Sequence, residues 1–351
     1  MSISNLQKDW LTTTLGLSRE KLSVQLIAGD ASPRRYYRVT SKVNERDDQS
    51  ASKIFMISPS TESNQEFLSI RALLEEYSIR VPRLFSADIC EGLFLLEDLG
   101  DEVLLGLLTN KSADRLYDQA LDMLHRMQIS VPASAKLPLY EKARLQNELD
   151  LFPRWFIAKL LGMKESREAN KIFSGLSERL IASATEQPQV FVHRDFHSRN
   201  LMCLSNGDLA TIDFQDAVWG PITYDVVSLL KDCYIEWPRE RQLAWLTRYC
   251  QQLSQPVCMD DVPTPRIVRW FDLMGLQRHI KVLGIFARLA IRDSKPAYLA
   301  DLPRVIRYIR EVLLIYVSEP DIKLFRDWFE DLIMPEVTDQ AWFSDAESHS
   351  L

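Results

Sequence analysis

The sequence is poor in glycine, has few cysteines and contains no long hydrophobic run. Glycine accounts for 11 of the 351 residues, about half of the usual ~7%, which excludes a collagen-like or low-complexity chain. The 5 cysteines are odd in number and form no C-x-x-C pair, which argues against a disulfide framework or a zinc knuckle. The most apolar stretch, Val282 to Ile291, is too short to span a bilayer and is expected to be a buried helix. Lys8 and Asp9 stand where a signal peptide would be apolar, so we expect a cytoplasmic protein.

An excess of positive charge is also absent. The formal net charge is -7, and 46% of the residues are hydrophobic, which is typical of a folded chain and not of a disordered one. Residues 319–347 contain nine acidic residues and two basic ones, so this segment accounts for the whole imbalance. The sequence therefore favours neither a nucleic-acid polymer, whose binding needs many basic side chains, nor a membrane as a partner.

Hydrophobic periodicity divides the chain into two regions. Short β-branched or aromatic segments predict a small sheet, with one helix over 66–77 and a polar loop over 41–52; the expected strands are 24–27, 35–40, 53–57 and 93–96. A helical period dominates from about residue 112, with expected helices around 116–127 and over 143–162, 167–186, 224–235, 240–253, 267–292 and 302–317. We predict an α+β protein with a small β-rich lobe, residues 1–99, and a larger, mainly helical lobe, residues 100–351.

One β-like segment, residues 190–214, interrupts the helical region and carries the candidate chemistry. Its pattern is strand, loop, strand, turn and strand, and the pair Asn206-Gly207 predicts a hairpin turn. Asn200 and Asp213 are equally distant from the centre of this turn. A simple hairpin would therefore place them opposite each other, with Asp195 in the loop that enters the same end.

These three side chains suit phosphoryl transfer. Carboxylate and amide oxygens are good ligands for Mg²⁺, and a separate aspartate, kept off the metal, can accept the proton of the attacking hydroxyl. We interpret Asp195 as the base and Asn200 and Asp213 as the Mg²⁺ ligands. Each residue alone is compatible with an ordinary loop, and only the combined spacing H-R-D-x4-N, hairpin and I-D-F favours a kinase. His193 is expected to hold the loop.

At these motifs the sequence resembles the aminoglycoside phosphotransferase family, which has a bilobal, protein-kinase-like fold. Further segments, at 29–38, 213–230, 234–238 and 277–289, resemble a bacterial group within it, the anomeric (1-) kinases of N-acetylmuramate and N-acetylglucosamine. The resemblance implies that ATP and Mg²⁺ are used to phosphorylate the anomeric hydroxyl, in a recycling of peptidoglycan sugars toward UDP-N-acetylmuramate. It also implies that the backbone of Glu97 to Leu99 pairs with adenine and that Asp225 braces the catalytic loop.

The sequence departs from the general kinase pattern at the third strand. Kinases place a lysine there, paired with a helix glutamate, to hold the phosphates. Here residues 55–58 contain no lysine, although Glu66 stands where its partner is expected. We hypothesise that Arg34 or Arg35, in the turn that also holds Ser32, supplies the charge that faces the ATP phosphates. The alternative is that both arginines are solvated.

The acceptor side is defined less sharply. N-Acetylmuramate carries a carboxylate, and helix 267–292 places Arg278, Lys281, Arg288 and Arg292 on one stripe, which is either a solvated face or part of a sugar site. The candidate sugar contacts are polar or aromatic residues near the motif or in the group-specific segments: Arg199, Asp216, Tyr234, Trp237, Arg278 and His279. An isolated aromatic residue of this kind is more often part of the core than of a sugar site.

Three other interpretations stay open. The chain could phosphorylate another small alcohol, such as an aminoglycoside, choline or homoserine. It could be a nucleotide-binding pseudokinase that recruits a partner, or a metal-dependent hydrolase that uses His193, Asp195 and His197. The sequence does not rank the two amino sugars, and it leaves the oligomeric state open.

Overall fold

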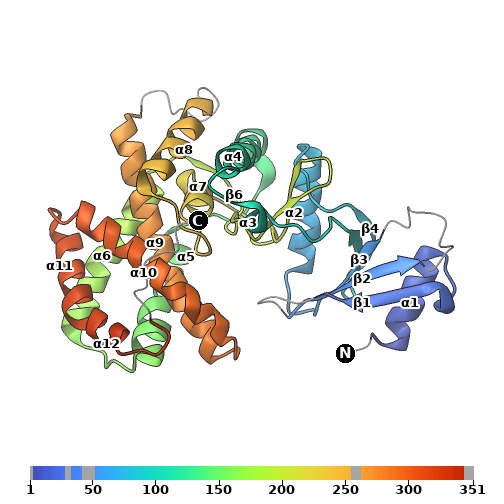
Figure 1. Cartoon of the computed structure of the whole chain (residues 1–351), viewed down its shortest axis with the longest axis horizontal. Coiled ribbons are helices and arrows are strands. Elements are labelled where there is room, and N and C mark those ends of the chain that lie inside the picture. Colours follow the sequence, from blue (N-terminus) through green and yellow to red (C-terminus); the bar gives the residue numbers. More distant parts are fainter. Residues whose placement is uncertain (1–2, 28–32, 42–51, 254–261, 344–351) are drawn as a thin grey trace. The chain divides into compact units, whose positions relative to one another are not determined.

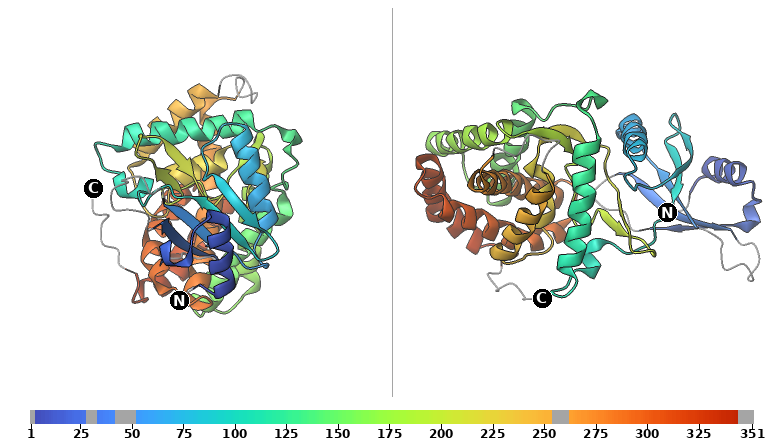
Figure 2. Two further views of the ribbon diagram at one scale, coloured as in Figure 1. Left: turned by 90° about the vertical axis from the view of Figure 1, so that its right-hand side faces the viewer. Right: turned by 90° about the horizontal axis from the view of Figure 1, so that it is seen from above.

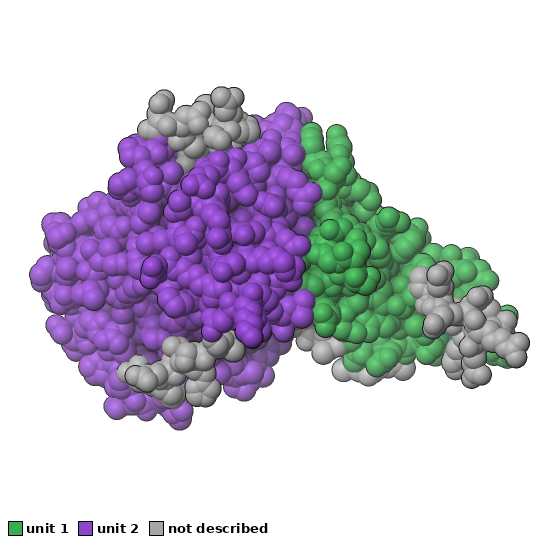
Figure 3. Space-filling model, turned by 45° about the horizontal axis from the view of Figure 1, so that its top comes forward, with its two compact units in different colours: residues 1–103, 201–216 green, residues 104–200, 217–351 purple. Residues whose placement is uncertain are grey.

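The computed structural model describes residues 3–27, 33–41, 52–253 and 262–343. Its contacts divide the chain into two compact units, residues 1–103 with 201–216 and residues 104–200 with 217–351 (Figure 3). This division differs from the predicted boundary at residue 99, because the hairpin segment 201–216 belongs to the first unit. Among the described residues, none of the helices is both long and apolar enough to cross a membrane.

A five-stranded antiparallel sheet, in the order β1-β2-β3-β5-β4, forms the first unit (Figure 1). The strands are β1 (Leu22–Leu26), β2 (Arg35–Ser41), β3 (Lys53–Ile57), β4 (Leu84–Asp88) and β5 (Leu93–Glu97), and the helices are α1 (Asn5–Leu15) and α2 (Asn64–Glu76). The predicted strands correspond to β1, β2, β3 and β5, and the predicted helix corresponds to α2. Strand β4 and helix α1 were not predicted.

Each face of this sheet packs against a helix. Helix α1, dark blue in Figure 2, contributes Leu11 to one apolar cluster with Tyr37 and Phe55, whose side chains point to the same face. Because side chains alternate along a strand, Phe94 of β5 points to the other face, where Phe67 of α2 meets it edge-on at a ring distance of 5.7 Å. Arg34, one of the candidate nucleotide residues, lies next to Phe67 on this second face.

The hairpin of β7 (Leu201–Cys203) and β8 (Leu209–Thr211) is tied to the first unit by backbone hydrogen bonds. The N–H of Thr211 donates to the carbonyl of Arg80 at 2.9 Å, and the N–H of Cys203 donates to that of Glu102 at 2.8 Å. Phe214, just after the hairpin, stacks on Phe67 at 5.3 Å. These contacts explain why the segment that contains Asp213 groups with the β-rich unit.

Helices surround a two-stranded sheet in the second unit. The strands are β6 (Gln189–Val192) and β9 (Val218–Pro221), and the α-helices are α3 (Leu104–Leu107), α4 (Ala113–Ser130), α5 (Lys142–Leu149), α6 (Arg167–Thr185), α7 (Thr223–Leu230), α8 (Arg239–Gln252), α9 (Thr264–Ile291), α10 (Leu302–Ile315), α11 (Pro320–Trp328) and α12 (Met334–Thr338) (Figure 1). The predicted helix over 143–162 is divided into α5 and a π-helical segment, Phe152–Leu160. Helix α9 is buried over most of its length, and Gly284 lets it approach closely, because a Cβ there would lie 2.4 Å from the backbone of Leu151.

Candidate active site

A buried aspartate braces the loop between β6 and β7, which carries the candidate base Asp195. Asp225 of α7 accepts hydrogen bonds from the backbone N–H groups of His193, at 2.6 Å, and Arg194, at 3.0 Å. Arg194 has a φ of 76°, a left-handed conformation that costs a non-glycine residue about 1 kcal/mol or more. The two hydrogen bonds offset this cost, and the bracing role that the resemblance implied for Asp225 is confirmed.

The carboxylate of Asp195 accepts no hydrogen bond from any residue that the structure describes. Its backbone carbonyl accepts hydrogen bonds from the N–H of His197 and from the side-chain amide of Asn200, each at 3.0 Å. Burial alone would raise the pKa of Asp195, but the positive charges of Lys281 and Arg278 hold this pKa below its usual value. The carboxylate is therefore ionised at neutral pH and able to accept a proton.

Glu148 of α5 links the catalytic loop to helix α9. Its carboxylate, in a residue that is 7% exposed, forms ion pairs with Arg194 and, at 3.0 Å, with Lys281, and it also accepts a hydrogen bond from the hydroxyl of Tyr140. Burial would raise the pKa of Glu148, but the two cations hold it low, so the carboxylate is charged. A buried network of this kind is rigid, and removing one member leaves an uncompensated charge.

Two residues of the predicted basic stripe support the same loop. Arg278 donates hydrogen bonds to the carbonyl of Arg194, at 2.9 Å, and to the hydroxyl of Tyr224, at 3.2 Å, and Lys281 donates to that hydroxyl at 2.9 Å. Both side chains are buried, whereas Arg292 at the end of the stripe is exposed. The solvated-face interpretation is wrong for Arg278 and Lys281. For Arg278 the structure favours a positioning role over the predicted sugar contact.

The turn of the β7–β8 hairpin is one residue longer than the prediction assumed. Leu201 pairs with Thr211, and the N–H of Leu204 donates to the carbonyl of Asp208 at 2.8 Å. Gly207, with a φ of 87°, completes a loop of three residues, in which glycine supplies the left-handed position. A two-residue turn at Asn206-Gly207 would have given the register expected from the sequence.

The prediction that Asn200 and Asp213 lie opposite each other is therefore wrong by one position. The observed pairs, from Leu201 with Thr211 to Cys203 with Leu209, are centred on Asn206, so Asn200 and Asp213 are not equally distant from the centre of the turn. Asp213 has a φ of 63° and accepts a hydrogen bond from the side-chain amide of Gln215 at 2.8 Å. Since the amide nitrogen of Asn200 donates to the Asp195 carbonyl, its Oδ1 faces away from that bond and has no partner among the described residues. Their role as metal ligands stays a prediction.

Arg34 occupies a buried polar position at the start of β2. It is 3% exposed, its Nε donates to Oγ of Ser58 at 3.2 Å, and the same atom lies 3.8 Å from the carboxylate of Glu62. Its guanidinium carbon lies 5.6 Å from the ring centre of Phe67. The charge of Arg34 is thus held between the end of β3 and the start of α2, on the sheet face that α2 covers.

The acidic residue beside Arg34 is not Glu66, which stands at the position of the usual helix glutamate. Glu66 is exposed on α2, whereas Glu62, just before the helix, lies beside Arg34. Arg35 is also exposed, because successive residues of a strand point to opposite faces. Of the two arginines, Arg34 is the better candidate for a phosphate-facing charge. Ser32 lies outside the described residues.

In the segment at the end of β5, hydrogen bonds hold the side chains of Glu97 and Asp98, whereas the backbone groups of Leu99 make none with the described residues. The carboxylate of Glu97 accepts hydrogen bonds from Arg80 at 2.6 and 2.8 Å, and that of Asp98 accepts one from Arg38 at 3.0 Å. The N–H and C=O groups of Leu99 have no hydrogen-bond partner within the described residues. This arrangement is compatible with adenine pairing by the backbone of Glu97 and Leu99, which stays a prediction.

Comparison with known proteins identifies the family of this chain. Residues 23–271 match the phosphotransferase enzyme family. The chain belongs to this family. Three curated relatives, from Pseudomonas putida KT2440, Pseudomonas aeruginosa PAO1 and Neisseria meningitidis serogroup B, are N-acetylmuramate/N-acetylglucosamine kinases. They are 40%, 41% and 35% identical to this chain, over 83%, 80% and 89% of its length and 84%, 81% and 91% of their own.

Solved structures show the same fold at low sequence identity. An ADP-bound aminoglycoside phosphotransferase has a TM-score of 0.59 at 13% identity, covering 88% of this chain and 99% of that one. The choline kinase of Streptococcus pneumoniae has a TM-score of 0.60 at 14% identity, covering 87% and 98%. The predicted family and the α+β, kinase-like fold class are confirmed.

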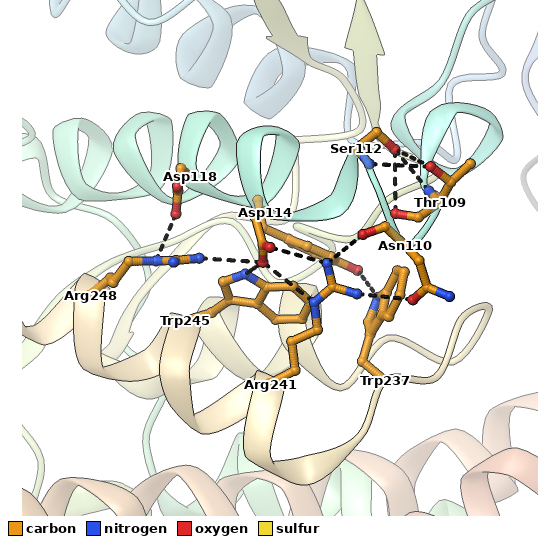
Figure 4. A network of polar contacts seen from close by, with 10 residues as sticks. Thr109, Asn110, Ser112, Asp114, Asp118, Trp237, Arg241, Trp245 and Arg248 are labelled. Atoms are coloured by element: carbon orange, nitrogen blue, oxygen red, sulfur yellow. Dashed lines mark hydrogen bonds and ion pairs between the residues drawn. The ribbon is translucent and has the colours of Figure 1, made fainter. Parts of the chain in front are cut away.

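Trp237 of this phosphotransferase is a core residue. It is 4% exposed, and its indole N–H donates to the hydroxyl of Tyr117 at 2.8 Å. Arg241 lies 4.6 Å from its ring centre and is itself held by Asn110 and Asp114 (Figure 4). The structure does not support the predicted stacking of Trp237 on a sugar, because the side chain is buried.

His279 is also part of the core. One ring nitrogen lies 2.9 Å from the carbonyl of Lys231, and the ring stacks on Tyr308 at 4.7 Å. Burial lowers the pKa of His279 to about 3, so the imidazole is neutral at physiological pH. The sugar contact predicted for His279 is wrong, since the residue is fully buried.

Because His279 is buried in its neutral form, we expect the folded protein to lose stability in mild acid. The unfolded chain binds a proton at this residue near pH 6.5, but the native state does so only near pH 3. Stability therefore falls as pH drops below 6.5, by about 1.4 kcal/mol between pH 7.5 and 5.5. Urea unfolding of the wild type and of His279→Gln, which keeps a donor for the Lys231 carbonyl, should show this difference in pH dependence. Identical dependence in both proteins would contradict the assignment.

Arg199 and Tyr234 remain at the catalytic loop as candidate sugar contacts. The guanidinium carbon of Arg199 lies 3.6 Å from the ring centre of Tyr234. Asp216 is exposed, in the first unit. Glu148 and Asp232 support the loop from 46 and 34 residues away and were not predicted, because no local motif marks them.

Proposed function

We propose that this phosphotransferase is an ATP-dependent kinase that phosphorylates the anomeric hydroxyl of N-acetylmuramate and N-acetylglucosamine. The observation that carries the proposal is identity of 35 to 41% with three kinases of these two sugars, over at least 80% of each chain. The presence of Asp195, Asn200 and Asp213 supports an active enzyme and not a pseudokinase. Because the reaction consumes ATP, we place it in the cytoplasm, in the recycling of peptidoglycan sugars toward UDP-N-acetylmuramate.

Asp195 acts as the base in this proposal. Its ionised carboxylate accepts a hydrogen bond from the anomeric hydroxyl and takes its proton as the oxygen attacks the γ-phosphorus. A bond forms between that oxygen and phosphorus, the bond between phosphorus and the β,γ-bridging oxygen breaks, and ADP leaves. The network of Glu148, Lys281 and Arg278 keeps the loop in place, so the base needs little rearrangement during the reaction.

Asn200 and Asp213 would hold Mg²⁺, through an amide oxygen and a carboxylate. Such a set fits this ion, which proteins bind through one or two side chains together with substrate phosphates. When bound, Mg²⁺ neutralises charge on the phosphates. Arg34 would contact the phosphates from the first unit, and the backbone of Glu97 and Leu99 would bind adenine.

A panel of acceptors tests the proposal. Release of ADP is measured with the purified full-length chain, ATP, Mg²⁺ and either N-acetylmuramate, N-acetylglucosamine, choline, homoserine or kanamycin. We expect turnover with the two amino sugars at kcat/KM values at least about 100-fold above those of the other acceptors, a difference of about 2.7 kcal/mol. Turnover of choline, homoserine or kanamycin alone would refute the proposal in favour of another acceptor.

The role of Arg34 gives a separate prediction. Arg34→Ala is expected to lower kcat/KM for ATP by about 10- to 100-fold, because a charge-assisted hydrogen bond is worth about 1.5–3 kcal/mol. The matched variant Arg35→Ala, which loses an exposed arginine, should change it by less than about threefold. Steady-state kinetics with varied ATP decide the matter, with melting temperatures as a check on folding. Equal effects of the two substitutions would contradict the assignment.

A further inference from the structure

Tyr234 carries an arginine whose hydrogen-bond donors are unused. The guanidinium of Arg199 stacks on its ring at 3.6 Å and is half-buried. It makes no hydrogen bond or ion pair with the residues that the structure describes. Arg241 is also stacked on an aromatic ring, but its guanidinium forms a hydrogen bond with Asn110 and an ion pair with Asp114. Arg199 therefore presents a fixed, planar set of N–H groups of the kind that binds a carboxylate.

Buried hydrogen bonds fix this arginine–tyrosine pair. Asp232, which is 2% exposed, accepts hydrogen bonds from the N–H of Ser198, at 2.9 Å, and of Tyr234, at 3.1 Å, as well as from the Ser198 hydroxyl. On the other side of Arg199, the amide of Asn200 is bonded to the catalytic loop. The backbone that carries Arg199 is thus anchored at both neighbours, so little order has to be created when a ligand binds.

Other aromatic rings pack against Tyr234. His197 meets its ring edge-on at 5.3 Å, and Phe286 lies at 6.4 Å and contacts Tyr298 at 5.2 Å. Burial raises the pKa of Tyr234, so its phenol stays neutral. Phe286 is itself buried, so these rings hold Tyr234 in place beneath the guanidinium of Arg199.

The acidic group near Arg199 has another partner. Asp301 accepts a hydrogen bond from Arg304 at 3.1 Å, and Arg304 also donates to the carbonyl of Cys233 at 2.7 Å. Asp301 and Asp232 are therefore both held by other donors, and neither occupies the N–H groups of Arg199. An incoming anion can use these groups.

We propose that Arg199 determines acceptor specificity by binding the carboxylate of the lactyl group of N-acetylmuramate, with Tyr234 holding the guanidinium plane. This proposal rests on the proposed function. Arg199 comes four residues after the proposed base and directly before a proposed metal ligand, so the chain brings it to the place where the acceptor reacts. N-Acetylglucosamine lacks the lactyl group and makes no such contact. The role predicted for Arg278 and His279 thus belongs to Arg199.

The ratio of the kcat/KM values for N-acetylmuramate and N-acetylglucosamine tests this assignment. In Arg199→Ala this ratio is expected to fall by about 10- to 100-fold, and in Arg199→Lys, which keeps the charge but not the fork, by less. The matched control is Arg266→Ala, which removes an arginine 5.0 Å from the ring centre of Trp270 on α9 and should leave the ratio unchanged. A loss that is equal for both sugars would overturn the proposal, as would an unchanged ratio.

A neutral acceptor gives a second test, whose main comparison is made with the wild type. The methyl ester of N-acetylmuramate keeps the lactyl group but not its charge. The wild type should use the ester about 10- to 100-fold less well than the acid, and Arg199→Ala should not distinguish the two. If the wild type uses ester and acid equally well, the proposal fails although the proposed function stands. If it phosphorylates neither amino sugar, the proposed function fails as well.

Discussion

Replacing Asp195 with asparagine is expected to lower kcat by about 10²- to 10⁴-fold, because the amide cannot accept a proton from the acceptor hydroxyl. The KM for ATP and the affinity for ADP should change by less than about threefold, since the carboxylate is kept off the nucleotide in this account. Rapid-quench kinetics and calorimetric titration with Mg²⁺ and ADP measure the two effects separately.

The Asp195→Asn variant is expected to keep the structure of the catalytic loop. Asparagine has the same shape, and the backbone carbonyl that receives the Asn200 amide is retained, so the loop should keep its structure. A thermal melt close to that of the wild type would support this. Normal turnover by Asp195→Asn would exclude Asp195 as the base.

Replacing Asp213 with asparagine is expected to weaken the binding of Mg²⁺ and ATP and to leave proton transfer to Asp195 unaffected. Loss of one negative ligand should raise the Mg²⁺ concentration for half-maximal velocity at least about tenfold and lower kcat/KM for ATP by about 10²-fold or more. The matched control is Asp208→Asn, an exposed aspartate in the turn of the same hairpin, which should leave both values unchanged. Titration of velocity with Mg²⁺ at fixed ATP checks the prediction, and an unaltered Mg²⁺ requirement in Asp213→Asn would contradict it.

The sequence predicted the elements whose signals are local. β-branched and aromatic runs marked four strands of the sheet, and the 3.6-residue period marked α2, α4 and α6. Helix α1 was missed although Ser4 and Gln7 form a capping box and Gly16 ends the helix in a left-handed conformation. Its period is weak because only Leu11 is buried. No helix was predicted for the acidic segment, residues 319–347, although Glu319 and Asp321 at the start of α11 pair with Arg269 and Arg179.

In the candidate site, too, only the residues marked by a local motif could be predicted from the sequence. The spacing of Asp195, Asn200 and Asp213 is a local property, so a motif was enough to single them out. A one-residue change of turn type nevertheless altered their register, since composition alone does not separate two-residue from three-residue hairpin loops.

The support of the loop could not be predicted from local patterns. Glu148 and Arg278 meet Arg194 from 46 and 84 residues away, and only tertiary packing brings them together. Helix α9 is buried on most sides, so its period does not tell which face His279 occupies. The polar stripe that suggested a solvated or sugar-binding surface is, at Arg278 and Lys281, an internal scaffold.

The position of the transferred phosphate tests the central claim most directly. The purified chain is incubated with ATP, Mg²⁺ and N-acetylmuramate or N-acetylglucosamine, and the product is examined by ³¹P NMR with coupling to the sugar protons. The account predicts phosphate on the anomeric oxygen of both sugars. Phosphate on C6, or no phosphorylated product from either sugar, would contradict it.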